Sequence, residues 1–577
     1  MLDKLYTELL LTIISERTRA LQHTKDVRIS SNLGYYLENI SIDPSAPGND
    51  ELEINDGLDE PISFFPTVHG FRRFKDKVLS VLHQCKEGNL GSFTWELGSC
   101  VPQDILGSNG YLPLKQKNLT SIRLITDASC APMNYSLSPF TRLTSLSWHG
   151  VREREDLTAL RECLRVCSHQ LVHLDLDFLP RDKIRDGEFD FKSNNSSFTY
   201  ELLKPFPDHH RVSFPKVREL SLANVSLLYT EELTEAFKFS SMRSLTFRYC
   251  PDLEELLEYF LFLDEPFYID RLEIQAWAEI TFEDNPEETD LGTAILNFIG
   301  MTRDLKELFL STSRCPEAWI AIFHHSHTLR NLVFHERAGP EPWELGELLR
   351  DAPGPSIMDI WAWENCAIFN ADNKLRLEFL GLCCKLEDFS PKFYPEIGDS
   401  RVKVLHVRQS GLEIQLKLEN DYYRKSYTLT DLLRGKRKIR VREEEDKGKD
   451  GNDESNDGNI IPQPVCSGND HDTTKPSRSN DEATDNRVFP NRALRALGPF
   501  ATWAFSRAGF RELELLTFGD FSHNGRYSKQ NILLCRQKEP HPPGSKNHRH
   551  VTKDDTTLLD LFQQYSHALG ACPSDLF

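Results

Sequence analysis

The sequence predicts an α/β fold in which one unit, a short strand followed by a loop and a helix, is repeated along the chain. Two observations predict it: an apolar pattern recurs at a nearly constant spacing, and segments with helical periodicity lie between its copies. Such a unit cannot bury its own apolar face, so neighbouring units must stack. The expected architecture is an irregular solenoid with parallel strands on the concave side and helices on the convex side.

The recurring pattern is an apolar residue, two residues of any kind, a second apolar residue, one residue of any kind and a third apolar residue. Ten copies begin at Leu90, Leu119, Leu143, Leu171, Val217, Met242, Ile269, Leu305, Leu329 and Ile357, and two later ones at Val402 and Phe510. Seven of the nine steps between the first ten starts span 24–29 residues, which chance alternation does not explain. The two longer steps contain a polar segment at 181–212 and an acidic loop at 283–290.

The segments between the copies predict helices. Ahead of the copy at Leu171, apolar residues fall at helical spacing from Leu157 to Cys167, and they predict one buried stripe. Residues 295–299 and 319–323 show comparable apolar clusters ahead of the next strands. Each predicted strand is therefore followed by a predicted helix.

A period of 24–29 residues with this strand pattern resembles the leucine-rich repeat. In that family an Asn or Cys usually follows at the ninth position and hydrogen-bonds along the loops. Here only Cys250 and Asn365 occupy that position, so the resemblance implies an irregular leucine-rich-repeat solenoid with variable loops.

The N-terminal segment 5–14 resembles the first helix of an F-box through Leu5, Glu8, Leu9, Leu10 and Ile13, with Tyr6 where the family usually has Pro. The likeness ends near Ser15. The resemblance implies that Leu5, Leu9, Leu10 and Ile13 dock on a Skp-type adaptor of a cullin ligase. The alternative is an amphipathic helix that caps the array.

Composition divides the rest of the chain. Residues 443–488 are acidic and carry no aromatic side chain before Phe489, which predicts a disordered linker. The expected organisation is an F-box remnant or cap at 1–45, the solenoid at 68–442, the linker at 443–488 and a C-terminal repeat and cap at 489–577. The basic run 434–442 has two interpretations, a nuclear import signal or a solvated segment balanced by the acidic residues after it.

Charge and cysteine usage narrow the classes of partner and compartment. The chain has 68 Lys and Arg against 88 Asp and Glu, a formal net charge of −20, which disfavours nucleic acid or an acidic membrane as partner. No apolar stretch reaches the length of a membrane helix. The 13 cysteines include no C-x-x-C pair, which is typical of reduced thiols and predicts a cytoplasmic or nuclear protein.

The sequence shows no motif of an enzyme. Phosphate-binding loops, dinucleotide fingerprints and the G-x-S-x-G elbow are missing from it. The densest histidine cluster, at 324–327, has no convergent second ligand group, so a polar turn is expected there rather than a metal site. No cofactor and no metal are predicted.

With no enzyme motif in the sequence, the expected function is the binding of a partner protein by the concave face. Residues that flank the buried strand positions point into the concavity. The residues predicted to contact a partner are Arg123, Asp175, Asp177, Arg248, Arg271, Glu273, Trp361, Trp363 and Arg408. His149, His173, Glu307, Asp359 and His406 are expected on the same face. Trp361 and Trp363 are alternate residues of one predicted strand, so they either form an interface hot spot or pack under a loop.

We therefore expect a non-enzymatic recognition protein. With the F-box resemblance, the expectation is a substrate adaptor of a cullin-based ubiquitin ligase, whose repeats bind an unknown protein substrate. The alternative is a repeat scaffold without a role in ubiquitin transfer.

Overall fold

The structure is a computed structural model. It describes residues 23–30, 68–126, 134–151, 155–178, 198–203, 212–263, 266–276, 291–312, 318–336, 375–382, 401–408, 497–522, 531–537, 547–552 and 555–573. These residues form a mixed α/β fold around one large, mostly parallel sheet, as the sequence predicts.

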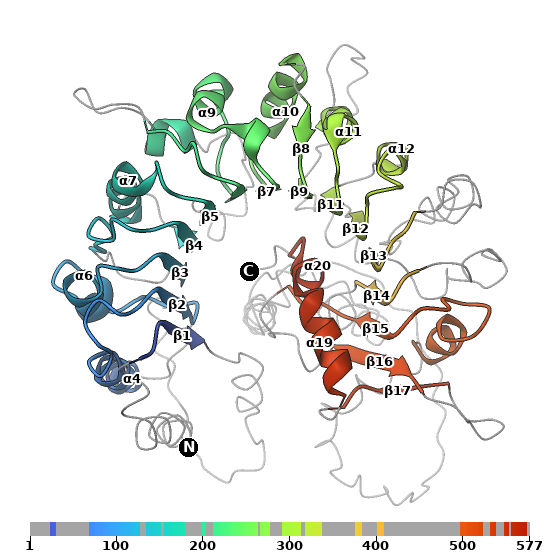
Figure 1. The fold of residues 1–577 in the computed structure, drawn as a ribbon, viewed down its shortest axis with the longest axis horizontal. Coiled ribbons are helices and arrows are strands. Elements are labelled where there is room, and N and C mark those ends of the chain that lie inside the picture. Colours follow the sequence, from blue (N-terminus) through green and yellow to red (C-terminus); the bar gives the residue numbers. More distant parts are fainter. Residues whose placement is uncertain are drawn as a thin grey trace, which may run out of the picture.

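The sheet has fifteen strands among the described residues, and they lie side by side in sequence order apart from the separate pair β8 and β10. Its strands are β1 (Asp26–Ser30), β2 (Ser92–Glu96), β3 (Ser121–Ile125), β4 (Ser145–Val151), β5 (His173–Phe178), β6 (Glu219–Ala223), β7 (Ser244–Arg248), β9 (Arg271–Gln275), β11 (Glu307–Thr312), β12 (Asn331–Glu336), β13 (Phe379–Leu382), β14 (Val404–Val407), β15 (Leu515–Phe518), β16 (Ile532–Arg536) and β17 (His548–His550). Pairing is parallel from β1 to β15 and antiparallel from β15 to β17. The sheet follows an arc whose inner side is lined by strands (Figure 1).

Helices lie on the outer side of this arc (Figure 1). They are α4 (Val68–Leu82), α5 (Gln103–Leu106), α6 (Tyr111–Lys115), α7 (Glu155–Cys167), α9 (Thr230–Ala236), α10 (Leu253–Phe262), α11 (Leu291–Met301) and α12 (Ala318–Phe323), with short turns η2 (Thr199–Leu203) and η3 (Phe239–Ser241) and the two-stranded sheet of β8 (Phe267–Tyr268) and β10 (Thr302–Arg303). The helices predicted at 157–167, 295–299 and 319–323 are confirmed as α7, α11 and α12.

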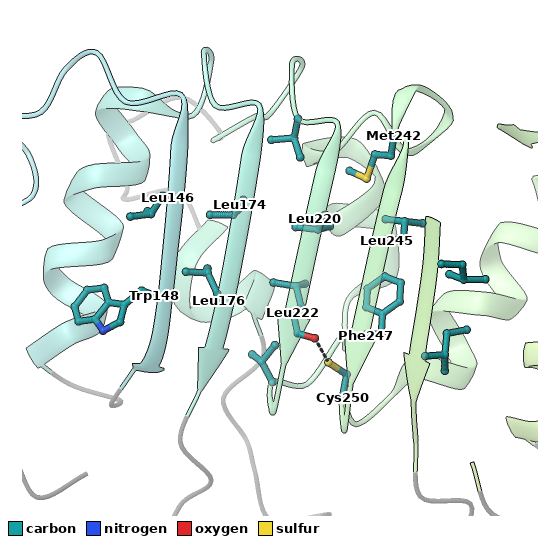
Figure 2. Close-up of a cluster of buried hydrophobic side chains, with 14 of the residues drawn as sticks. Leu146, Trp148, Leu174, Leu176, Leu220, Leu222, Met242, Leu245, Phe247 and Cys250 are labelled. Carbon is teal, nitrogen blue, oxygen red and sulfur yellow. Dashed lines mark hydrogen bonds between the residues drawn. The ribbon is translucent and has the colours of Figure 1, made fainter. Parts of the chain in front are cut away.

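The repeated apolar positions form the core between the sheet and these helices. The register sets Leu146, Leu174, Leu220 and Leu245 side by side on consecutive strands, all at 1 % exposure or less. Figure 2 shows these rows of side chains on neighbouring strands. Each copy of the pattern thus supplies one layer of a continuous core, which is why no unit could bury its apolar face alone.

Two predicted copies are placed differently by the structure. The strand beside β12 is β13. Its buried residues Leu380 and Leu382 match the pattern together with Leu377, which lies just before it, whereas the copy predicted at Ile357 lies outside the described residues. In the copy predicted at Phe510 the register is shifted by three positions. There Leu516 and Phe518 pair with the core residues of β14, while Leu515 faces the other side of the sheet.

The ends of the sheet lie in segments expected to cap it. β1 belongs to the segment 1–45 but pairs with β2, so the sheet begins before the predicted start of the array at residue 68. Strands β15 to β17 belong to 489–577 and continue the same sheet. Within the segment predicted to end in a C-terminal cap, α19 (Thr556–Gln564) and α20 (Ser566–Gly570) lie on the inner side of the arc rather than at its end (Figure 1).

Among the described cysteines, one departs from the prediction. The other six are buried and form no disulfide, as expected for thiols that act as small core residues: Cys85, Cys163, Cys167, Cys250, Cys535 and Cys572. Cys100, in contrast, is disulfide-bonded, which the spacing of cysteines did not indicate.

Candidate functional site on the concave face

The concave face is the inner side of the arc, and it is lined by residues that alternate with the core positions. Over β2 to β9 these residues are mostly polar or charged, and over β11 to β15 many are apolar. Because successive side chains of a strand point to opposite faces, the parallel register sets equivalent concave residues side by side on neighbouring strands. The face therefore has a charged half and an apolar half.

At the start of the charged half, Glu96 is shared by two arginines. Its carboxylate lies 2.6 Å from Arg28 on β1 and 3.0 Å from Arg123 on β3. The Glu96 side chain is only 9 % exposed, whereas those of Arg28 and Arg123 are 68 % and 41 % exposed. The Glu96 carboxylate is thus buried at the surface of the sheet, and the guanidinium groups of Arg28 and Arg123 are exposed to solvent on the concave face.

In the middle of the charged half, Asp175 holds a second cluster. Its Oδ2 atom lies 2.7 Å from Nε2 of His149 and accepts a hydrogen bond of 2.8 Å from the hydroxyl of Ser147. Burial raises the pKa of Asp175, but the charge and hydrogen bond of His149 outweigh burial and hold that pKa well below its usual range. Asp177, the next residue of β5 on the concave face, accepts a hydrogen bond of 2.9 Å from the side-chain amide of Asn224.

The local backbone that positions His149 requires glycine. The register between β4 and β5 shifts after His149, and Gly150 there has a φ of +85°. A Cβ atom at this position would lie 2.1 Å from the carbonyl oxygen of Thr126, so any side chain would collide with the neighbouring strand. The irregularity ends the alternation of β4 just beyond His149.

The His149–Asp175 pair predicts a pH dependence of stability. Burial lowers the pKa of His149, but the charge and hydrogen bond of Asp175 raise it more, and the net shift is upward from 6.5. The folded state therefore binds this proton more tightly, so the stabilisation is complete below pH 6.5 and is lost as the pH rises through the raised pKa. We expect the free energy of unfolding of the wild type to fall over this window relative to His149→Gln.

Urea unfolding of both proteins between about pH 5.5 and 8.5 measures this difference, because groups other than His149 cancel in the comparison. Parallel curves for the two proteins would show that the pair does not stabilise the fold.

At the end of the charged half, Arg248 of β7 and Glu273 of β9 form a two-pronged ion pair. Nε and Nη2 of Arg248 donate to the two carboxylate oxygens of Glu273 at 2.6 and 3.0 Å. Burial lowers the pKa of Arg248, but the charge and hydrogen bond of Glu273 raise it, and the net result is a pKa above the ordinary value. Beside this pair, Arg271 donates to Glu307 at 2.5 Å, and Asn331 donates to the same carboxylate at 3.1 Å.

The apolar half is covered by the end of the chain. Phe309, Val333, Phe379, Val404 and Leu515 are concave residues of β11 to β15, each at most 1 % exposed. They form one buried cluster with Tyr565, Ala568, Leu569, Ala571 and Cys572. We call residues 565–573 the C-terminal segment.

The C-terminal segment is also bound by polar side chains of the sheet. Nη2 of Arg408 donates to the carbonyl oxygens of Ala571 and Cys572 at 2.6 and 2.9 Å. Glu273 accepts a hydrogen bond of 2.9 Å from the backbone N–H of Cys572. Farther along, the Tyr565 hydroxyl donates to Glu378 at 3.2 Å.

The structure brings together six of the predicted contact residues in the charged half: Arg123, Asp175, Asp177, Arg248, Arg271 and Glu273. Glu273 and Arg408 were expected to be accessible, but they are only 4 % and 5 % exposed because the C-terminal segment covers them. His406 is buried as well, and burial together with Arg408 lowers its pKa to about 3. The remaining predicted residues lie outside the described residues: Asp359, Trp361 and Trp363 of the concave face, and Leu5, Leu9, Leu10 and Ile13 of the N-terminal segment.

Sequence reasoning missed the C-terminal segment as part of this face. The signal was present in the strands 379–382, 404–407 and 515–518, where apolar residues run on with little alternation. A continuous apolar run predicts a strand buried on both faces, and hence a cover on the concave side.

Among the residues that the structure describes, no group of three or more His, Cys, Asp or Glu could hold a metal ion. The Ser147 hydroxyl donates to the carboxylate of the His149–Asp175 pair, and Ser221 also hydrogen-bonds to that carboxylate, whereas an activated nucleophile would donate to the imidazole. His325 of the histidine cluster is buried, with Nε2 2.9 Å from the carbonyl oxygen of Ile299, as expected for a polar turn.

Comparison with protein-family models found no match to the chain, and comparison with curated proteins found none either. Of the helices in the described ranges, none has the length and apolar character needed to cross a membrane.

Proposed function

We propose that the fold is an irregular leucine-rich-repeat solenoid. Three observations support this: the recurring apolar pattern, the strands that follow one another in sequence order, and the helices on the outer side. A fourth is the thiol of Cys250, at the ninth position of its repeat, which donates to the carbonyl oxygen of Leu222 in the preceding unit at 3.3 Å (Figure 2). That is the bond along the loops which the family's Asn or Cys provides.

We further propose that the protein is a non-enzymatic recognition module whose concave face binds another protein. The single observation that carries this proposal is the charged half of the face, where acidic and basic side chains are held in ion pairs of fixed geometry and remain partly exposed. Mixed charge in a preorganised array suits a protein surface, which also carries both signs, better than a uniformly anionic nucleic acid.

The N-terminal resemblance makes this module an F-box-type substrate adaptor of a cullin-based ubiquitin ligase. Leu5, Leu9, Leu10 and Ile13 dock on a Skp-type adaptor, and the concave face selects the substrate. Such a protein acts by raising the concentration of its substrate near the ligase. The second candidate is a repeat scaffold without ubiquitin chemistry, in which the N-terminal helix only caps the array. Its support is that β1 pairs with β2 at the start of the sheet.

Affinity capture of the full-length chain separates the two candidates. We expect a Skp-type adaptor and a cullin with the wild type, and their loss with the double variant Leu9→Asp, Leu10→Asp, because charged side chains cannot enter an apolar docking surface. Deletion of residues 1–20 should have the same effect. Thermal melting should be unchanged by the double variant.

Leu114→Asp is the matched control, since Leu114 is 51 % exposed and the same change there should leave capture intact. A drop in melting temperature with unchanged capture in the double variant would assign the N-terminal helix to the scaffold. Substrate selection is tested in the same samples by Arg123→Glu, which should remove co-captured proteins but keep the Skp-type adaptor.

A further inference from the structure

The C-terminal segment lies on the concave face in the manner of a bound peptide. α20 and the residues after it contact the apolar strip formed by Phe309, Val333, Phe379, Val404 and Leu515, on the inner side of the arc (Figure 1). The segment brings five buried residues to this strip. The preceding helix, α19, has no buried residue, so the segment is tethered by a helix that is itself largely solvated.

Side chains on the sheet form hydrogen bonds with the backbone of this segment, in addition to the apolar contacts with its side chains. Arg408 binds the carbonyl oxygens of residues 571 and 572, Gln275 donates to that of Pro573 at 2.5 Å, and Glu273 accepts from the N–H of Cys572. Glu273 and Gln275 belong to β9, about 300 residues away from the segment in the chain, and Arg408 directly follows β14, about 160 residues away. Backbone groups are common to all polypeptides, so a segment from another protein can make the same hydrogen bonds.

Arg408 is incompletely satisfied by the segment. Its side chain is 95 % buried, yet among the described residues no acceptor lies within hydrogen-bond reach of Nε or Nη1. Two neutral carbonyl oxygens share Nη2 instead. A guanidinium group binds a carboxylate more strongly than it binds carbonyls, and in a two-pronged geometry that uses two of its nitrogens.

We propose that the surface under the C-terminal segment is a peptide-binding groove for the free carboxyl terminus of a partner protein, and that residues 565–573 occupy it in cis. The partner's last residues would place apolar side chains on the strip and their terminal carboxylate on Arg408, and would displace the C-terminal segment. This inference rests on the proposed recognition function and names the end of the partner that the groove takes.

The energetics of exchange favour this arrangement. When the C-terminal segment leaves, the charges of Arg408 and Glu273 regain water, which offsets part of the loss of apolar contacts. An ordinary core has no such compensation. A covalently attached segment has an effective concentration in the millimolar range, so a partner must gain an interaction that the segment lacks. The carboxylate on Arg408 is that interaction.

The test uses the full chain with a specific protease site inserted between Lys553 and Asp554, cleaved after folding. A labelled peptide of residues 556–572 is then added, either with its free carboxylate at Cys572 or with that end amidated, and binding is followed by fluorescence anisotropy. The two peptides differ only at the group that faces Arg408. We expect the free acid to bind about tenfold more tightly than the amide.

In Arg408→Gln the difference between the two peptides should vanish, and in the matched variant Arg303→Gln, an exposed arginine on β10, it should persist. The comparison of the two peptides on the wild-type sequence needs no variant to fold. Equal binding of the two peptides would overturn the proposal. So would a cleaved chain that retains its own segment and takes up neither peptide, or one that unfolds on cleavage. None of these results depends on a Skp-type adaptor. Failure of the peptide-binding test can therefore be distinguished from failure of the capture experiment that tests the proposed function.

Discussion

Replacing Trp148 by alanine is expected to lower the free energy of unfolding by about 4 kcal/mol. The indole is fully buried in the core between β4 and the outer helices. It packs edge-on against Tyr135 at 5.6 Å between ring centroids, and its Nε1–H donates to the Thr126 hydroxyl at 3.1 Å. Its removal leaves a cavity inside a layered core that cannot collapse without moving both neighbouring layers. The Thr126 hydroxyl loses one donor but keeps its hydrogen bonds to the carbonyl oxygens of His149 and Gly150. Urea unfolding measures the change.

Phe262→Ala is the control for this prediction. Phe262 is an aromatic residue of the same fold, at the end of α10, but it is 83 % exposed. Its truncation should change the free energy of unfolding by less than about 0.5 kcal/mol. Similar losses for the two variants would mean that burial does not decide their contributions.

The second large effect is expected for Glu273→Ala, at about 3 kcal/mol. The variant leaves the guanidinium of Arg248, whose side chain is 20 % exposed, without its carboxylate, and the N–H of Cys572 without its acceptor. Both groups then lie in poorly solvated surroundings. Hydrogen exchange of residues 565–573 should also speed up, because the C-terminal segment loses one of its polar anchors.

Asp270→Ala tests whether the effect follows from burial of the pair. Asp270 lies 2.7 Å from Lys306, with side chains 36 % and 60 % exposed, so that removal of this carboxylate should cost at most about 1 kcal/mol. In the double variant Arg248→Met, Glu273→Ala much of the loss should be recovered, since no buried charge remains unpaired. A double variant as unstable as the sum of the single ones would contradict this reason.

The mixed α/β fold and its strand positions follow from the sequence because the core is built from a local, repeated pattern. The buried residues of β2 to β12 and the helices α7, α11 and α12 lie where the pattern puts them. Leu377, Leu380 and Leu382 satisfy the same pattern, but Ile357 competed with them at a better spacing. Only pairing with β12 decides between such copies, and pairing is not local information.

The candidate site was predictable on its charged half and not on its apolar half. Arg123, Asp175 and Arg248 were found because strand alternation alone places them on the concave face. What covers Glu273 and Arg408 is the C-terminal segment, which is about 300 and about 160 residues distant in the chain. Periodicity describes one strand at a time, so it carries no information about a contact between elements this far apart. The partners His149–Asp175 and Arg271–Glu307 required the register as well.

The sequential order of the strands has a consequence for how the chain folds. From β2 to β14 each parallel strand pairs with the next one in the sheet at most 48 residues away in the chain (Asn331 with Phe379), so this part of the sheet can nucleate at many points and grow outward at low contact order. The bonds from Glu273 and Arg408 to the C-terminal segment close longer loops, and the entropy lost in closing them is offset only when the sheet between them is complete. Synthesis on the ribosome adds residues 565–573 after every strand of the sheet that the structure describes. A nascent chain thus passes through a stage in which its parallel sheet is built and its apolar strip is still open to whatever polypeptide is near.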